Sequence, residues 1–400
     1  MKYTLYHKEL PVITFEINDK GYVRKIYNVE NKDHVPPQFL EKGKLIEEDD
    51  YYALEDKITR WMVDRGVPSS RKNINAVLAK LEISSTSELA QKSCYLSLFD
   101  QYWTAPTEEK IEWKDINFFT NKFSDYVGSL MIDVTPNGRS ESTFHSPNNT
   151  AQGNLEKKWC IKKDGKRVLY KSGSGSEQLE PFNEVLAYEI CQRLGIPHVE
   201  YDISFIQRKH FSVCNNFITK DTELITAYQL CADIADSWND EITLDDLLER
   251  CKLYKIPVSK VDLGVMFALD FIIANTDRHT NNFGFIRDAN TLEWIGMAPI
   301  YDSGNSMFMY AQDFELEENG TDSRRIQAKP FAVNQMDQLM LFPLDEISKR
   351  MDLSRLDGID SFYRDMLMTN KRNINISKII GLANVLKSRV NELKEILNQS

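Results

Sequence analysis

The chain has 400 residues and a mass of 46.4 kDa, enough for a two-lobed enzyme or for two to three small domains. Its composition, 42% hydrophobic and 27% charged, is that of a folded protein and excludes a disordered or fibrous one. The formal net charge of -11 argues against a broad nucleic-acid-binding face, so we expect no direct contact with nucleic acid.

The cysteines and the N-terminus indicate a cytoplasmic protein. No Cys-x-x-Cys pair occurs, which predicts buried free thiols in a reducing compartment rather than a zinc site or a disulfide framework. Residues 1–16 lack the pattern of a signal peptide, and the most apolar segment, residues 261–274, carries two aspartates, so we expect no membrane contact. The six cysteines are Cys94, Cys160, Cys191, Cys214, Cys231 and Cys251.

The first 125 residues are interpreted as an N-terminal subdomain of unknown role. Residues 12–17 alternate between apolar and polar, residues 18–21 form a turn, and residues 22–26 resume the alternation, which predicts a β-hairpin. The pattern then becomes helical, and an aromatic-rich stretch follows at residues 95–103. The apolar residues of the helical pattern are Leu54, Ile58, Trp61 and Met62, then Val77, Leu78 and Leu81.

The next part begins with a polar loop, residues 138–153, and continues with strands. Asp164-Gly165 separates two strand patterns at residues 158–162 and 167–171, and this dipeptide is a strong signal for a hairpin. A flexible stretch at residues 172–176 then precedes a predicted helix. The helix covers residues 181–194 and ends at Gly195 and Pro197, and two more strands are expected at residues 199–205 and 211–217.

From about residue 222 the pattern is mainly helical. Ser259 and Asp262 form a predicted capping box for a buried helix. A short hairpin is expected at residues 283–287 and 292–295, and it ends at Ile300-Tyr301-Asp302. The last predicted helix carries an apolar stripe of Ile379, Leu382, Leu386, Val390, Leu393 and Leu397.

The segment at residues 275–282 follows the buried helix and gathers an acid, an imidazole and amides, as catalytic loops do. Phosphoryl transfer needs a carboxylate for the hydroxyl proton, an amide oxygen for magnesium and a second carboxylate at the metal. Asp277, Asn282 and Asp302 provide this set in that chain order. Ordinary turns rich in Asp, Asn, Ser and Gly are the alternative interpretation. We interpret His279 as a structural residue that hydrogen-bonds the loop, since no second histidine lies at metal-ligand spacing.

Three segments carry a resemblance to a known family. Residues 277–283 resemble the Asp-x-His-x-(Lys)-Asn-(Phe) catalytic loop of the HipA-like kinases, and residues 300–303 resemble its metal-binding Tyr-Asp segment. Residues 150–157 are similar to its nucleotide loop, with Thr first, Gly three residues later and Lys seven later. The resemblance covers about residues 140–320. Asn281 stands where the family often has Lys, and Gly153 is the loop's single glycine.

The resemblance implies an α+β, bilobal, protein-kinase-like fold that binds ATP and Mg²⁺. Residues 126–220 would form an N-lobe with an antiparallel sheet, and residues 221–400 a mainly helical C-lobe. Asp277 would be the catalytic base, and Asn282 and Asp302 the magnesium ligands. Thr150 or Ser146 would be a site of self-phosphorylation. The nucleotide-binding residues implied are Thr150, Gly153, Lys157, Lys171, Glu184, Asn215 and Phe217.

These expectations favour a serine/threonine protein kinase that acts on a protein substrate. Such a kinase could be the toxin of a toxin-antitoxin module, with a small helix-turn-helix antitoxin as its partner, or a regulatory kinase. Two alternatives remain: a lipid or small-molecule kinase, and a nucleotide-binding pseudokinase that serves as a partner-binding module. The sequence has no basic membrane-facing helix, which argues against lipid, and it retains all three of Asp277, Asn282 and Asp302, which argues against a pseudokinase.

Overall fold

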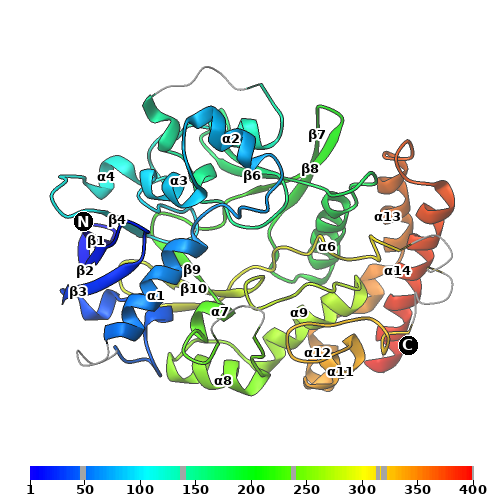
Figure 1. Ribbon diagram of the computed structural model, residues 1–400. Coiled ribbons are helices and arrows are strands. Elements are labelled where there is room, and N and C mark those ends of the chain that lie inside the picture. The colour runs from blue at the N-terminus through cyan, green and yellow to red at the C-terminus, as the bar shows by residue number, and fades with distance from the viewer. Residues whose placement is uncertain (46–50, 136–140, 236–239, 312–315, 317–321, 399–400) are drawn as a thin grey trace.

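The computed structural model describes residues 1–45, 51–135, 141–235, 240–311, 316 and 322–398. The N-terminus lies at one end of the molecule beside the first sheet, and the long C-terminal helix lies at the other (Figure 1). The described residues form mixed α and β structure with antiparallel sheets, as the predicted fold class requires.

The first sheet has the strand order β3-β2-β1-β4. The expected N-terminal hairpin is confirmed, because Ile13 of β2 lies opposite Val29 of β3. Helix α1 packs its apolar face, including Ile58 and Trp61, against this sheet. The strands are Lys2–His7 (β1), Leu10–Ile17 (β2), Val23–Val29 (β3) and Tyr102–Pro106 (β4), and the helices of this part are Tyr51–Asp64 (α1), Ile74–Leu81 (α2), Thr86–Lys92 (α3), Trp113–Ile116 (α4) and Tyr126–Met131 (α5).

The second sheet has the order β5-β6-β8-β7, and helix α6 packs against it. The loop of its first hairpin is longer than the sequence indicates. Strand β5 ends at Ile161 and β6 begins at Arg167, and the Lys162 N–H donates to the Lys166 carbonyl across the Asp164-Gly165 turn. Helix α6 ends at Gly195, whose φ of +71° is favourable for glycine. The elements are Lys157–Ile161 (β5), Arg167–Ser172 (β6), Glu180–Leu194 (α6), Tyr201–Ile206 (β7) and Lys209–Asn215 (β8).

The remaining residues form a small sheet, β11-β10-β9, surrounded by helices. The capping box of Ser259 and Asp262 is present at the start of α9, and almost every residue of α9 is buried. The strands are Thr222–Thr226 (β9), Gly284–Asp288 (β10) and Trp294–Met297 (β11), and the helices are Ala227–Leu230 (α7), Leu244–Leu253 (α8), Lys260–Ile272 (α9), Gln335–Met340 (α11), Leu344–Arg350 (α12), Ile359–Met368 (α13) and Ile376–Ile396 (α14).

Three strands differ from the sequence interpretation. We assigned no element to the residues of β1, interpreted the region of β4 only as an aromatic stretch after helices, and interpreted residues from 222 onward as mainly helical. Four of the five residues of β4 are buried, so it lacks the polar alternation that marks a half-exposed strand. Strand β9 is only five residues long and holds a fully buried glutamate, Glu223. Tertiary packing, rather than local pattern, produces these strands.

The first 125 residues share a core with the rest of the chain. One apolar cluster contains Trp103, Trp113 and Phe118 together with Trp159 of β5 and Leu224 of β9. A second, larger cluster lies among α6, α9, α13 and α14. The shared cluster places the N-terminal residues in direct contact with both later sheets.

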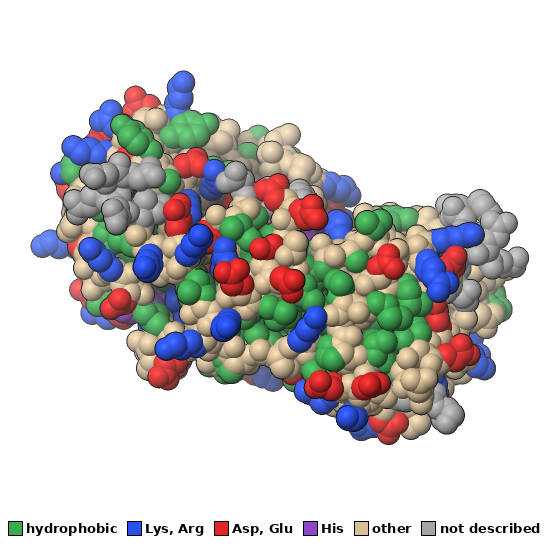
Figure 2. All heavy atoms as spheres, turned by 90° about the horizontal axis from the view of Figure 1, so that it is seen from below, with side chains coloured by type: hydrophobic (Ala, Val, Ile, Leu, Met, Phe, Trp, Pro, Cys, Tyr) green, Lys and Arg blue, Asp and Glu red, His purple; other side chains and the backbone are tan. Residues whose placement is uncertain are grey.

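The molecular surface mixes charges of both signs. On the face seen from below, acidic and basic side chains are interspersed, and apolar side chains gather toward the C-terminal side (Figure 2). Within the described ranges, no helix is both long enough and apolar enough to cross a membrane. All six cysteines are free; four are buried as expected, whereas Cys94 and Cys160 are only half-buried.

Candidate active site

The loop after α9 is held by hydrogen bonds that begin inside the helix. Asn275 donates from Nδ2 to Oδ1 of Asp270 at 2.8 Å, and its own Oδ1 accepts the backbone N–H of Asp277 at 3.0 Å. Asp270 is buried on the last turns of α9. The position of Asp277 is therefore fixed by the helix that precedes it.

Arg278 joins this loop to the segment after β11. Its buried guanidinium forms a two-point ion pair with Asp270, with both N···O distances at 2.9 Å. It also donates to the carbonyls of Asn282 (2.8 Å) and Tyr301 (2.5 Å) and to Oγ of Ser303 (3.0 Å). One side chain thus brings the predicted base, Asp277, and the two predicted metal ligands onto adjoining segments.

The carboxylate of Asp277 faces a lysine that is distant in sequence. Oδ1 of Asp277 accepts a hydrogen bond from Nζ of Lys329 at 3.0 Å, and the Asp277 side chain is 34% exposed. The carboxylate is accessible to a substrate hydroxyl and has a cation beside it. His279 hydrogen-bonds the loop as expected, since its Nδ1 accepts the N–H of Asn281 at 3.2 Å.

Asn282 and Asp302 supply oxygen atoms on neighbouring segments. Asn282 donates from Nδ2 to the carbonyl of Asp277 at 2.9 Å, which fixes the amide and leaves Oδ1 as its acceptor atom. Asp302 has a φ of +54°, a conformation unfavourable for a residue with a side chain and often found at functional sites. Its side chain is 39% exposed.

Lys171, Glu184 and Asp302 form one ion cluster. Nζ of Lys171, on β6, contacts Oδ1 of Asp302 and lies 3.4 Å from Oε1 of Glu184, on α6. Glu184 is fully buried and also accepts the N–H of Ser303 at 2.8 Å. The resemblance implied that Glu184 lies at the nucleotide site, and the structure brings it to Lys171.

The pKa values in this cluster follow from burial and from the cation. Partial burial would raise the pKa of Asp302, but the Lys171 ammonium outweighs burial and lowers this pKa to about 2. Burial keeps the pKa of Glu184 above its ordinary value despite Lys171. Burial would lower the pKa of Lys171, but Asp302 and Glu184 raise it. Asp302 is therefore ionised and Lys171 is charged at neutral pH.

The donor set at Asn282 and Asp302 fits magnesium better than a transition metal. Among the described residues, no group of three or more His, Cys, Asp or Glu side chains could enclose a metal ion. Magnesium is instead held by one or two protein oxygens, with waters and substrate phosphates completing its octahedral shell. An ionised carboxylate and an amide oxygen on joined segments satisfy that requirement.

The predicted nucleotide loop lies against the N-terminal part of the chain. Gly153 has a φ of +82°, and a side chain there would come within 2.7 Å of Nζ of Lys157. Burial, then the neighbouring cations Arg71 and Lys171, lower the pKa of Lys157 to about 7. Thr150 and Ser146 are both buried, and Thr150 Oγ1 donates to the Leu96 carbonyl at 2.5 Å.

The predicted nucleotide-binding residues Asn215 and Phe217 lie at and just after the end of β8. Asn215 ends that strand, and Asn216 donates from Nδ2 to the carbonyls of Leu98 (3.1 Å) and Ile218 (2.9 Å). The ring of Phe217 lies 5.6 Å from the ring of Tyr301, which precedes Asp302. Asn215 and Phe217 therefore lie where the chain passes from the second sheet to the small sheet β11-β10-β9.

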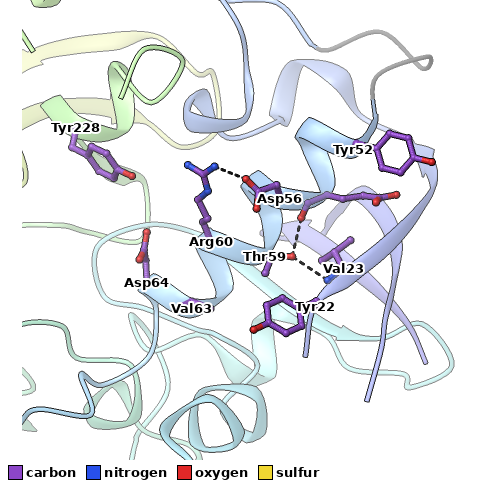
Figure 3. Close-up of a pocket in the computed structure, with 10 residues that line it drawn as sticks. Tyr22, Val23, Tyr52, Asp56, Thr59, Arg60, Val63, Asp64 and Tyr228 are labelled. Atoms are coloured by element: carbon purple, nitrogen blue, oxygen red, sulfur yellow. Dashed lines mark hydrogen bonds and ion pairs between the residues drawn. The ribbon is translucent and has the colours of Figure 1, made fainter. Parts of the chain in front are cut away.

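Some residues of the site were not identified from sequence. Lys329 lies in an irregular stretch 52 positions after Asp277, with no motif around it. Arg278 was noted only as part of the loop, and its buried pairing with Asp270 could have been suspected from the aspartate in an apolar helix. A surface pocket lined by Tyr22, Tyr52, Asp56 and Tyr228 lies on α1, outside this cluster (Figure 3).

Comparison with known proteins decides the family. A family model described as the HipA-like C-terminal domain matches residues 144–353, more than half of the chain. The chain belongs to the HipA-like family. The matched range contains all the predicted site residues, from Ser146 to Asp302, and also contains Lys329.

The chain is also similar to individual proteins. The serine/threonine-protein kinase CtkA of Helicobacter pylori (strain J99) is 30% identical over 138 residues, which cover 33% of this chain and 42% of CtkA. The match thus spans less than half of that relative. A crystal structure of the H. pylori proinflammatory kinase CtkA aligns with a TM-score of 0.46 and 19% identity over 61% of this chain and 94% of that one.

A solved structure covers almost the whole chain. HipA of Shewanella oneidensis MR-1, in a toxin-antitoxin complex with HipB and operator DNA, aligns with a TM-score of 0.53 and 11% identity over 98% of this chain and 97% of that one. The HipA-like fold therefore includes the N-terminal sheet as well as the later lobes.

Proposed function

We propose that this HipA-like protein is an ATP- and Mg²⁺-dependent serine/threonine protein kinase. One observation supports this above all: Lys171 contacts both Glu184 and Asp302, while Arg278 ties the Asp277 loop to the segment that carries Asp302. Protein kinases need such a lysine–glutamate pair and a metal-binding aspartate close to the catalytic loop. The kinase name of the relative CtkA supports the same activity.

Each residue then has a defined task. Asp277 accepts the proton of the substrate hydroxyl, and its exposed carboxylate suits that role. Lys171 binds the phosphates of ATP, and Glu184 holds Lys171 in place. Asp302 and Asn282 hold magnesium, which when bound neutralises charge on the phosphates. Gly153 and Lys157 bind the phosphates from the loop, and Asn215 to Phe217 meet the adenine through the backbone.

Lys329 lies beside Asp277, whereas the catalytic loop has Asn281 where the family often has Lys. Asn281 accepts a hydrogen bond from Thr226 Oγ1 at 3.0 Å. Lys329 reaches Asp277 from a different part of the chain. We propose that Lys329 neutralises charge on the transferred phosphoryl group beside Asp277.

Thr150 and Ser146 are proposed as sites of self-phosphorylation that switches the kinase off. A phosphate adds nearly two negative charges where the phosphates of ATP must bind, and it would also displace the Thr150 hydroxyl from Leu96. Because both hydroxyls are buried, the loop must leave its present position before it is modified.

The substrate is proposed to be a protein, and a toxin-antitoxin role is one candidate setting. It is supported by the S. oneidensis HipA structure, which was solved with HipB and operator DNA. We propose a small helix-turn-helix protein as the partner, with DNA contacted through that partner. A regulatory kinase without an antitoxin is the other setting.

The experiment is to incubate the purified chain with γ-labelled ATP, magnesium and a cytosolic extract. Label on serine or threonine of the chain or of extract proteins, lost when magnesium is chelated, supports the proposal. Label in lipid or in small molecules alone would contradict the protein-kinase assignment, and ATP binding without any transfer would indicate a pseudokinase.

A further inference from the structure

The predicted nucleotide loop is hydrogen-bonded residue by residue to the N-terminal part of the chain. We call these contacts the loop seam. They connect Asn149 with Ser93 (2.9 Å), Thr150 with Leu96 (2.5 Å), Ala151 and Gly153 with Arg71, Gln152 with Asp64 (2.6 Å), and Asn154 with Ser70 (2.8 Å). Every residue from 149 to 154 takes part, so the shape of the loop depends on residues 64–96.

Arg71 is the central residue of the loop seam. It is 2% exposed, and within the described part of the chain its hydrogen bonds all go to the carbonyls of Ala151 and Gly153, including one from Nε to Gly153 at 2.9 Å. Among the described residues no carboxylate pairs with it, and Nη1 has no hydrogen-bond partner. Burial lowers the pKa of Arg71 to about 10. A buried cation with only neutral acceptors is costly, which indicates a role beyond packing.

The geometry of the peptide unit links the Arg71 contact to phosphate binding, because it relates the held carbonyls to the direction of the neighbouring N–H groups. In a trans peptide the C=O and N–H groups point in opposite directions. Because Arg71 holds the carbonyls of Ala151 and Gly153, the N–H groups of Gln152 and Asn154 point away from it. Neither N–H donates to a protein acceptor within the described ranges. Backbone N–H groups aimed together from a glycine loop form a binding site for anions.

Lys157 places an amino group at the same loop. Its Nζ lies next to Gly153, and its pKa is sensitive to the charges of Arg71, Lys171 and Asp302. In the sheet, Lys157 of β5 lies opposite Lys171 of β6. The loop is therefore connected on one side to Arg71 and on the other to the lysine that the proposed function assigns to the phosphates.

We propose that Arg71 is a positioning residue for the nucleotide loop. The N-terminal part of the chain thereby fixes the conformation of the loop that binds the triphosphate, without contacting the triphosphate. This inference rests on the proposed kinase function for the identity of the ligand. Arg71 acts on the loop carbonyls and does not touch the phosphates itself. Affinity for the phosphates of ATP depends on Arg71, whereas affinity for the nucleoside does not.

The test uses the full chain with Arg71→Gln, the milder Arg71→Lys, and the control Arg60→Gln, which removes an exposed guanidinium on α1. Amide hydrogen exchange of residues 150–156 is measured without nucleotide, and affinities for ATP and adenosine are measured by calorimetry. We expect faster exchange and about tenfold weaker ATP binding in Arg71→Gln, since the hydrogen bonds from the guanidinium to two loop carbonyls are lost. Adenosine affinity stays unchanged, Arg71→Lys lies between, and the control matches the parent.

Each other outcome has a definite meaning. Parental exchange and ATP affinity in both Arg71 variants would overturn the inference, as would faster exchange without loss of ATP affinity. An equal loss of affinity for ATP and for adenosine would mean general structural damage and would overturn the inference. Tighter ATP binding would mean that the loop seam keeps the loop away from the phosphates, and it would overturn the inference too. If the parent chain binds no ATP, the proposed function fails, and unchanged exchange in the variants would separately show that Arg71 does not position the loop. If Arg71→Gln does not fold, Arg71→Lys decides by the same two readouts.

Discussion

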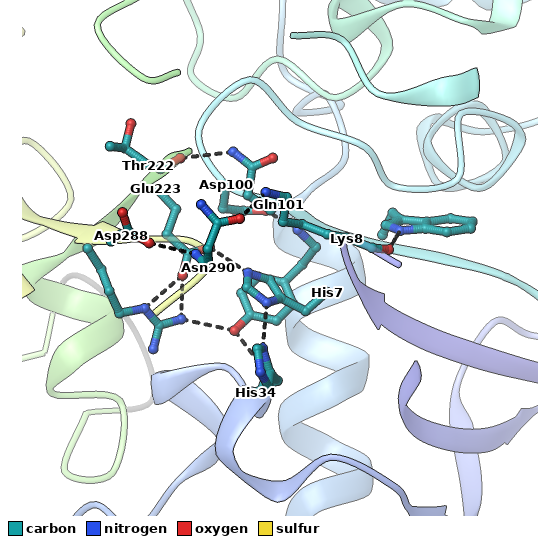
Figure 4. Close-up of polar contacts among 12 residues, drawn as sticks. His7, Lys8, His34, Asp100, Gln101, Thr222, Glu223, Asp288 and Asn290 are labelled. Carbon is teal, nitrogen blue, oxygen red and sulfur yellow. Dashed lines mark hydrogen bonds and ion pairs between the residues drawn. The ribbon is translucent and has the colours of Figure 1, made fainter. Parts of the chain in front are cut away.

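Two charged clusters among the described residues differ in the exposure of a carboxylate, since Glu223 of one is fully buried and Asp302 of the other is partly exposed. The first, which we call the interface network, joins the N-terminal sheet to β9 and β10 through His7, His34, Tyr102, Glu223 and Arg287 (Figure 4). The second is the candidate site around Lys171, Glu184 and Asp302. Both contain carboxylates and cations from distant parts of the chain.

In the interface network each of the five side chains hydrogen-bonds to at least one other member. Glu223 is fully buried and accepts from Arg287 at 2.7 Å and from His7 at 3.2 Å, while Tyr102 OH contacts both Arg287 and the His34 carbonyl at 3.0 Å. Burial would raise the pKa of Glu223, but Arg287 and His7 outweigh burial and lower it to about 2.

In the candidate site, by contrast, the carboxylates of Asp277 and Asp302 remain partly exposed, and Asp302 has an unfavourable backbone conformation. Matched buried charges fix the arrangement of elements, whereas partly exposed charges with remaining acceptor capacity can bind metal and phosphate. The comparison predicts that substitutions in the first cluster change stability and substitutions in the second change activity.

The largest expected effect is at Asp277. Asp277→Asn keeps the size of the side chain but removes the base, so phosphoryl transfer should fall by about 100-fold or more while ATP affinity stays nearly the same. Transfer rates and ATP affinity are measured beside Asp345→Asn, an exposed control on α12. Near-normal transfer by Asp277→Asn would remove this residue from the mechanism.

Glu223→Gln tests whether the interface network contributes to the stability of the fold. Loss of the charge leaves Arg287 buried without its partner, so the free energy of unfolding at pH 7 should fall by about 3 kcal/mol. The exposed Glu293→Gln in a neighbouring turn is the control. Denaturant unfolding measures the difference, and a stable Glu223→Gln protein with lost activity would contradict the division between the clusters.

The same variant has a predicted pH dependence. The folded pKa of Glu223, about 2, lies below the ordinary value of about 4.3, so its ionised form stabilises the fold above about pH 4.3. This contribution is lost as the pH falls from about 4.3 through about 2. The stability difference between parent and Glu223→Gln should therefore shrink over that window, and a constant difference would mean that charge is not its cause.

Lys329→Ala should have a smaller effect on activity. The turnover number should fall about tenfold with little change in ATP affinity, because one cation beside the transferred phosphoryl group is lost. Lys349→Ala, exposed on α12, is the matched control. A change in ATP affinity alone would place Lys329 at the nucleotide rather than beside Asp277.

The smallest expected effect is at Thr150. Thr150→Glu should weaken ATP binding several-fold more than Thr150→Ala, because both lose the bond to Leu96 but only the first adds negative charge. Mass spectrometry after incubation with Mg-ATP tests for phosphate on residues 142–150. An unmodified segment, or equal ATP affinities in the two variants, would contradict the proposal that self-phosphorylation switches the kinase off. The kinase proposal itself would be unaffected.

Local signals predicted much of this molecule and failed where distant segments meet. The capping box at Ser259, the hairpin around Asp164-Gly165 and the order of Asp277, Asn282 and Asp302 could be identified because each lies within a short stretch. Lys329 and Arg71 could not, because each reaches its partner across more than 50 residues, and nothing beside them in the sequence indicates which residue they contact.

The central claim is that the exposed carboxylate of Asp302 holds magnesium for ATP. Calorimetry of ATP binding with and without magnesium tests it on the parent, Asp302→Ala and Glu223→Gln. We predict that magnesium strengthens ATP binding to the parent and to folded Glu223→Gln, and that Asp302→Ala loses this gain while keeping most of its affinity for ATP alone. Equal losses by Asp302→Ala with and without magnesium would mean that Asp302 is structural and would contradict the account.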